Sequence, residues 1–126
     1  MVQLLVGLPD VNVLGLDDGR DMIEIHVECR RSRLGCPECG VLAHLKEQRI
    51  VTLVDPPCLA KPTKLAWHNR RWRCADLDCP IGSWTEGNDR IAAPRLCLTD
   101  RTGRWVTLEA GQFGQSVNKV AAVLGV

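Results

Sequence analysis

Two pairs of cysteines constrain what this 126-residue chain can fold into more than any other feature. The first pair lies in Cys36-Pro37-Glu38-Cys39-Gly40, and the second pair is Cys74 and Cys79. Such short spacings let two thiolates face one ion, and Gly40 tolerates the positive φ that turns backbone amides toward sulfur. Four sulfurs in two pairs are the usual ligands of a closed, tetrahedral zinc site. We therefore predict one structural Zn²⁺ ion, with no open position for catalysis, bound by Cys36, Cys39, Cys74 and Cys79.

The remaining cysteines and two histidines leave alternatives open. Cys29, Cys58 and Cys97 are expected to be small buried hydrophobic residues rather than ligands. His44 or His68 could replace one cysteine in a mixed site, although four cysteines already satisfy the ion. A redox function of the first cysteine pair would need a βαβ context, which the sequence lacks.

The segment before the first cysteine pair alternates between apolar and polar residues, as a half-buried hairpin does. Its strands are expected at Val11 to Leu16 and Met22 to Cys29, around turn residues 17–20. The buried face of the second strand is expected to carry Ile23, Ile25, Val27 and Cys29. His26 falls on the opposite face between Glu24 and Glu28, which predicts a surface histidine.

Two further strands are expected around the cysteine pairs. The β-branched residues from Arg49 to Val54 predict one strand, which Asp55-Pro56-Pro57 should end. Lys61 to Cys74 alternates again, with Leu65 and Trp67 on one face and Ala66, His68 and Trp72 on the other, and delivers Cys74 at the end of a strand. Core packing is the expected role of both tryptophans.

Beyond Pro94 the spacing of apolar residues becomes helical. Helices are expected from about Thr99 to Ala110 and from Ser116 to Leu124. The fold class is thus a small β-rich, zinc-ribbon-like domain with short C-terminal helices (α+β), divided into residues 1–92 and a helical tail, 98–126. Short helices are marginal without packing partners, so we expect the last ten or so residues to be poorly anchored.

Charge is unevenly distributed along the chain. Residues 1–28 contain six acids and one base, whereas the rest contains fifteen bases and nine acids. This asymmetry suggests an anionic partner for the second part. The acid-free strand before Cys74 offers four candidate phosphate contacts, although a solvated strand face would explain its arginines equally well: Lys64, Arg70, Arg71 and Arg73.

Targeting signals are not evident. The apolar run at the N-terminus has no basic flank and breaks at Pro9, and no stretch approaches the roughly 20 apolar residues of a membrane span. We therefore expect a cytoplasmic protein, in which thiols stay reduced and paired cysteines more often bind metal than form disulfides.

Taken together, these segments resemble the amino-terminal zinc-finger region of insertion-sequence transposases of the ISL-three family. The resemblance rests on five pieces in matching order and spacing: CPECG at 36–40, VTLVDPP at 51–57, RRWRC at 70–74, CP at 79–80 and WTE at 84–86. That family continues after the finger with a helix-turn-helix, and here Ser116 to Val126 is similar to its first part. In that comparison Ala121 packs at the helix crossing and Gly125 opens the tight turn.

The resemblance implies a zinc-dependent DNA-binding fragment that binds double-stranded DNA at transposon ends in the bacterial nucleoid. A recognition helix and an acidic-triad nuclease domain would follow in the family but are not within these residues, so we expect no enzymatic activity. The alternative is a protein-interaction or dimerisation module that contacts itself or a full-length transposase. A helical tail that simply caps the ribbon is a simpler interpretation of residues 98–126.

Overall fold

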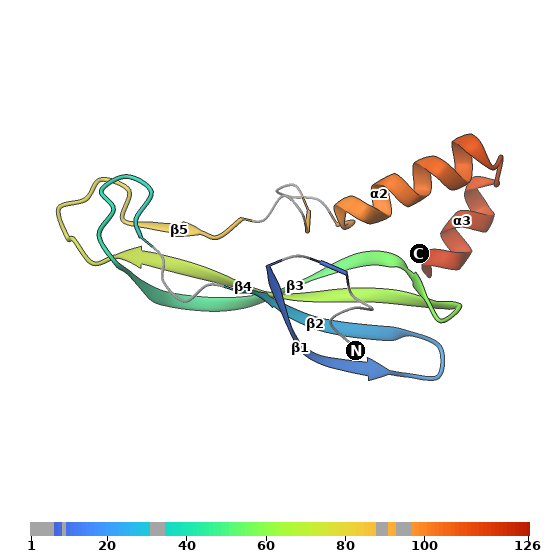
Figure 1. Ribbon diagram of the computed structural model, residues 1–126, viewed down its shortest axis with the longest axis horizontal. Helices are drawn as coiled ribbons and strands as arrows, with labels where there is room; N and C mark the ends of the chain where they lie inside the picture. The colour runs from blue at the N-terminus through green and yellow to red at the C-terminus, as the bar shows by residue number, and fades with distance from the viewer. Residues whose placement is uncertain (1–6, 9, 31–34, 88–90, 93–96) are drawn as a thin grey trace.

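The computed structural model describes residues 7–8, 10–30, 35–87, 91–92 and 97–126. Five strands form one twisted sheet, and two helices cover one end of it (Figure 1). The strands are β1 Val11–Asp18, β2 Ile23–Cys29, β3 Ala43–Cys58, β4 Lys61–Cys74 and β5 Ser83–Thr85; the helices are α2 Asp100–Thr107 and α3 Val117–Leu124. The predicted class, β-rich with short C-terminal helices, is confirmed.

The predicted N-terminal hairpin is confirmed. β1 and β2 pair antiparallel, with Leu16 opposite Ile25, and the Gly19 amide donates to the Met22 carbonyl at 2.9 Å to close the turn. Exposure alternates along β2 as expected, because its apolar residues face the core: Ile23, Ile25, Val27 and Cys29.

β4 matches its predicted bounds, but β3 is much longer than predicted. The prediction that Asp55-Pro56-Pro57 ends the strand is wrong, since β3 continues to Cys58. Two prolines fit there because β3 is the edge strand and its pairing with β4 shifts register between Asp55 and Cys58, so no ladder bond is lost at the missing amides. The connection to β4 is a two-residue loop in which both residues, Leu59 and Ala60, have positive φ.

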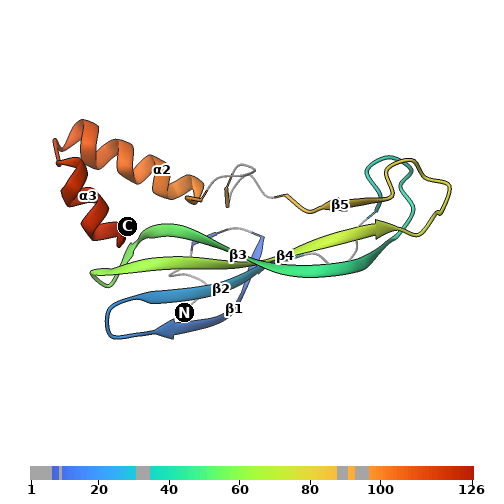
Figure 2. The same cartoon turned by 180° about the vertical axis from the view of Figure 1, so that it is seen from behind.

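β4 is the central strand, and its two edges are used differently. β3 pairs along one edge over nearly the whole strand. The other edge is shared in succession: β2 pairs parallel with Thr63 to Trp67, and β5 pairs antiparallel with Arg71 to Arg73. The β3–β4 ribbon therefore extends beyond the hairpin, and at about 3.3 Å per residue β4 alone spans roughly 45 Å. Figure 2 shows the same ribbon from behind, with its two ends far apart.

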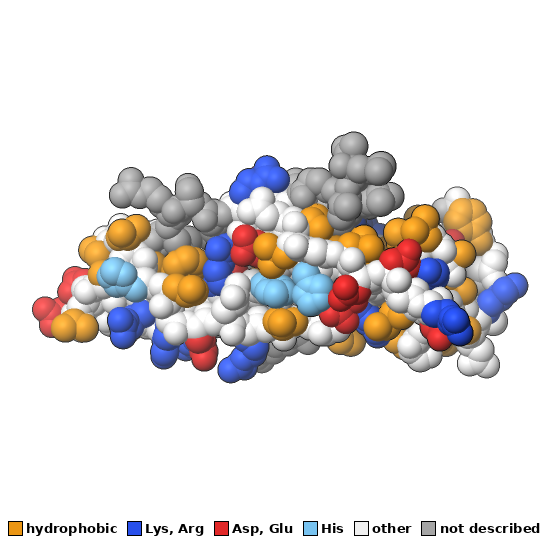
Figure 3. All heavy atoms as spheres, turned by 90° about the horizontal axis from the view of Figure 1, so that it is seen from below, with side chains coloured by type: hydrophobic (Ala, Val, Ile, Leu, Met, Phe, Trp, Pro, Cys, Tyr) orange, Lys and Arg blue, Asp and Glu red, His pale blue; other side chains and the backbone are white. Residues whose placement is uncertain are grey.

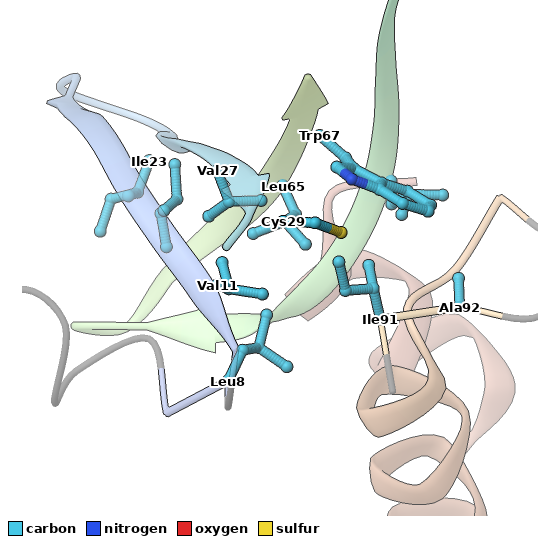
Figure 4. Close-up of a cluster of buried hydrophobic side chains, with 11 residues drawn as sticks. Leu8, Val11, Ile23, Val27, Cys29, Leu65, Trp67, Ile91 and Ala92 are labelled. Atoms are coloured by element: carbon cyan, nitrogen blue, oxygen red, sulfur yellow. The ribbon is translucent and has the colours of Figure 1, made fainter. Parts of the chain in front are cut away.

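The main apolar core lies on one face of the N-terminal part of the sheet (Figure 4). Inward residues of β1, β2 and β4 meet there with segment 91–92, and the fully buried members include Val11, Ile23, Val27, Leu65 and Ile91. Trp67 joins this core as expected. Trp72 is only partly buried, and of the three cysteines predicted to be buried Cys29 is buried, Cys58 is half-buried and Cys97 is exposed, which corrects the prediction for Cys97.

A second, smaller core attaches the helices to the sheet. Val54 of β3 packs with Val120 and Leu124 of α3, which are 7% and 4% exposed. The expectation that the last residues are poorly anchored is therefore wrong, because packing on the sheet supplies what an isolated helix lacks. Gly125 ends α3 in the left-handed conformation at φ 77° and lies against Pro62, so that an added Cβ would come within 2.8 Å of the proline ring.

A buried ion pair fixes the start of α2. The Asp55 carboxylate, 1% exposed, accepts hydrogen bonds from the Arg101 guanidinium and, at 2.8 Å, from the Thr99 hydroxyl. Thr99 is the N-cap of α2 and Thr102 donates to the Val54 carbonyl at 2.8 Å. Asp55 thus joins the end of β3 to the helical segment. Past α2 the chain continues as a π-helical turn, Leu108–Gln112, which accounts for the longer helix predicted to Ala110.

Candidate metal centre

The two cysteine pairs meet at the end of the β3–β4 ribbon that lies away from the helices (Figure 1). Cys36 and Cys39 lie in the turn before β3, Cys74 is the last residue of β4, and Cys79 lies in the turn between β4 and β5. Ala43 pairs with Cys74 across the ribbon, so the first turn is brought directly beside the second. Residues distant in the sequence therefore converge because β3 and β4 are antiparallel neighbours.

The four sulfur atoms form a compact group. Each lies within 4.8 Å of all the others. The Cys36 and Cys79 sulfurs are 3.7 Å apart, and those of Cys39 and Cys74 are 3.4 Å apart. Sulfurs placed tetrahedrally around an ion at a Zn–S distance of about 2.3 Å would be separated by about 3.8 Å. The observed donor set therefore fits one tetrahedral Zn²⁺ ion in both chemistry and size.

Both turns are zinc knuckles held by backbone hydrogen bonds. In the first, the Gly40 amide donates to the Cys36 carbonyl at 2.9 Å, and Gly40 has the predicted positive φ, 75°. In the second, the Cys79 amide donates to Asp76 at 3.1 Å and the Cys74 amide to Gly82 at 2.8 Å, with Gly82 at φ 67°. The sequence prediction did not single out Gly82, whose left-handed conformation returns the chain toward β5.

The thiols have unequal acidities. Burial raises the pKa of Cys36, but the amides of Cys39 and Glu38 and the neighbouring thiols donate to its sulfur and lower the pKa to about 7. Burial and the surrounding sulfurs raise the pKa of Cys74 to about 12, although the Asp76 amide acts to lower it. The Ile81 amide lowers the pKa of Cys79, whereas burial and the thiols of Cys36 and Cys39 raise it, and the pKa is raised overall. One ionised sulfur thus suppresses ionisation of its neighbours, so four thiolates need a cation among them.

Neither alternative histidine belongs to this group. His44 is exposed on β3, and His68 lies on β4 near the N-terminal hairpin with its Nε2 atom 2.8 Å from the Nδ1 atom of His26. The centre is therefore a four-cysteine metal-binding group of the structural, zinc-finger class. Such a site stabilises a fold and offers no open position to a reactant.

A family comparison names the particular kind of finger. Residues 32–79 match the model of the zinc-finger of transposase IS204/IS1001/IS1096/IS1165, so this segment is similar to the zinc finger of ISL3-type transposases. This match includes all four cysteines. No curated protein and no solved structure matched the chain. In the part of the chain that the structure describes, no helix has the combined length and apolar character needed to cross a membrane.

Residues outside the cysteine pairs support the finger, and the sequence prediction did not assign them this role. Trp84 of β5 packs against the buried cysteines. Glu86, 4% exposed, accepts a hydrogen bond from the Arg70 amide at 3.0 Å and lies 3.2 Å from the Nε atom of Arg70. Both residues belong to the WTE segment of the resemblance, which was the available signal. They tie β5 to β4, the strand that carries Cys74.

The four basic residues predicted to contact DNA do not share one surface. Alternation along β4 places Arg71 and Arg73 on one face and Lys64 and Arg70 on the other. Arg71 donates to the hydroxyls of Thr85 and Ser83 at 3.0 and 3.1 Å.

Arg70 has a different environment from the other three residues. Its guanidinium contacts Glu86, donates to the Cys29 carbonyl at 2.6 Å and lies 5.4 Å from the Trp72 ring centroid. Its charge is therefore already paired within the fold. The prediction that any of the four contacts phosphate stays a prediction.

Proposed function

We propose that this chain is a DNA-binding part of a transposase, in which one structural zinc ion shapes the finger that holds double-stranded DNA at transposon ends. The observation that carries the proposal is the convergence of four sulfurs within a segment that matches a transposase zinc finger. A closed four-thiolate site is suited to holding two turns in place, since its ion has no position for water. On this proposal the finger binds DNA without enzymatic activity of its own.

The proposed contact surface is the face of β4 and β5 that carries Arg71 and Arg73. Arg73 is exposed, and Arg71, two residues before it, lines a groove together with Glu47, Arg49, Val51, Asn69, Arg70 and Thr85. Arginine guanidinium groups and hydroxyls are common phosphate partners, and such contacts supply affinity and orientation more than sequence choice. Lys64 lies farther along the ribbon, and Arg70 serves better as an internal support of the finger.

The salt dependence of binding tests this proposal. Fluorescence anisotropy of a labelled linear duplex with the zinc-loaded chain should give a log affinity that falls linearly with log salt, with a slope of about −0.9 per phosphate contacted. The Arg73→Gln variant should reduce the slope by about one contact. Arg104→Gln is the matched control, because Arg104 is 73% exposed on α2 at the opposite end of the ribbon. A flat titration, or equal effects of both variants, would contradict the proposal.

A second candidate function, self-association, is favoured by the outer edge of β3. Residues 44–50 are exposed, and no strand within the described residues pairs with that edge. A free edge can accept a strand from a second copy, although Lys46, Glu47 and Arg49 are charges of the kind that discourage such pairing. Light scattering after size exclusion separates the candidates: a zinc-loaded dimer that ignores duplex DNA would favour this second function.

A further inference from the structure

Ligand-type side chains also gather far from the cysteines, on the outer face of the N-terminal part of the sheet. Asp17 lies directly opposite Glu24 across the β1–β2 pair, and His26 follows two residues later on β2. Alternation therefore points Glu24 and His26 away from the core face that Ile23 and Ile25 occupy. One ligand atom each from Asp17, Glu24 and His26 lie within 4.8 Å of one another. On the face shown in Figure 3, histidine side chains lie next to acidic ones.

The two carboxylates are poorly compensated by their surroundings. Like charges directly opposite each other in an antiparallel pair are destabilising. Asp18, on the other face, is paired with Lys61 at 2.7 Å, but in the described part of the chain Asp17 has no basic partner. Lys64 is opposite Glu24 on β4 but makes no ion pair with it among the described residues, and Glu24 instead contacts His26 Nε2 at 2.7 Å. A bound cation would remove the repulsion.

A second histidine supports the first from behind. His68 Nε2 is 2.8 Å from His26 Nδ1, and the rings meet edge to face with centroids 5.1 Å apart. If His26 donates its Nδ1 hydrogen to His68, its Nε2 atom presents a lone pair toward Asp17 and Glu24. Metal-bound histidines usually donate their other ring hydrogen to such an outer partner, which fixes the tautomer and orientation of the ring. His26 is only 25% exposed, so this orientation is also restricted by packing.

We propose that Asp17, Glu24 and His26 form a second site for a divalent transition-metal ion, separate from the cysteine centre, with His68 as a positioning residue. One imidazole and two carboxylates suit first-row ions that accept mixed nitrogen and oxygen ligands, and three protein ligands leave positions for water. The site is partly exposed and has no thiolate, so it binds more weakly than the cysteine centre. It does not depend on DNA binding.

Mn²⁺ is the best probe, because it prefers carboxylate and water ligands and does not compete well for thiolates. Added to the zinc-loaded full chain, Mn²⁺ should broaden the amide and imidazole NMR signals of His26 and its neighbours first and saturate at one equivalent. The Asp17→Asn and Glu24→Gln variants should abolish this effect. Asp18→Asn is the matched control, because it removes the same charge one residue away on the opposite face, and it should bind Mn²⁺ like the unmodified chain.

The positioning function of His68 has its own readout. His68→Gln should weaken Mn²⁺ affinity roughly 10–100-fold, as is typical of outer-shell partners, while leaving bound Mn²⁺ at His26. His44→Gln, which replaces the exposed histidine on β3, should change nothing. The proposal is overturned if Asp18→Asn and Asp17→Asn weaken binding equally, since Mn²⁺ would then be attracted only by the acidic hairpin, or if no broadening centres on His26. If Asp17→Asn failed to fold, comparison of Glu24→Gln with Asp18→Asn would test the same prediction.

Discussion

Replacement of Cys79 by serine should remove the zinc ion and unfold one end of the molecule only. A serine hydroxyl does not ionise near neutral pH, so three thiolates remain. Structural zinc contributes on the order of 10–16 kcal/mol in zinc-finger peptides, against a net stability of about 5–15 kcal/mol for a typical domain. Little apolar packing stabilises the region around the sulfurs, because the buried cluster there consists of Cys36, Cys74 and Cys79 with Trp84 packed against them. Without the ion, nothing comparable offsets the entropy of ordering both knuckles.

The unfolding should stop where the main core begins. Ile23, Val27 and Leu65 are fully buried in the N-terminal part of the sheet, well away from the knuckles. The part that depends on zinc is β5 with the ends of β3 and β4 beyond the β2 pairing, about a third of the strand residues. We expect metal analysis of Cys79→Ser to show no stoichiometric zinc and circular dichroism to show a loss of about a third of the strand signal.

Hydrogen exchange locates the loss and supplies the control. Amides of β5 and of the ends of β3 and β4 should lose protection, while amides around Val27 and Leu65 keep it. Cys97→Ser, which removes an exposed thiol outside the sulfur group, should behave like the unmodified chain. A Cys79→Ser protein that keeps one zinc ion and its full strand signal would refute the four-thiolate site, and a protein unfolded throughout would refute the independence of the main core.

Three other predictions follow from the geometry. The pKa of Cys36 is lowered to about 7, so below that pH its thiol must lose a proton when zinc binds, whereas above it the thiol is already ionised. Zinc affinity measured by competition with a chelator should therefore rise with pH, and the slope of log affinity against pH should be greater by about one below pH 7 than above it. Arg101→Met leaves the Asp55 carboxylate buried without its partner and should lower the free energy of unfolding by about 3–5 kcal/mol in urea titrations; a loss below about 1 kcal/mol would show that the pair is unimportant. Gly125→Ala combines a positive φ with a close contact to Pro62 and should cost about 1–3 kcal/mol, seen as a lower Tm; an unchanged Tm would contradict the close packing of α3.

The sequence alone indicated the first hairpin, β4, the two helices and the four cysteines whose sulfurs the structure brings together. Alternation is a local property, so the buried face of β2 and the full extent of β4 followed from residue order. The knuckle at Cys36 and Cys39 is also local, since a turn of four residues brings both sulfurs to one side whatever the rest of the chain does.

Only the tertiary structure decided which elements meet. Strand alternation does not reveal a strand's partner, so the parallel pairing of β2 with β4, and its replacement by β5 farther along the same edge, could not be foreseen. The partners of charged residues could not be foreseen either, because the sequence around an arginine is similar whether its side chain faces solvent or a buried carboxylate. Arg70 beside Glu86 and Arg101 beside Asp55 acquire their roles only when distant segments pack and exclude water, which makes each pairing a requirement of the fold.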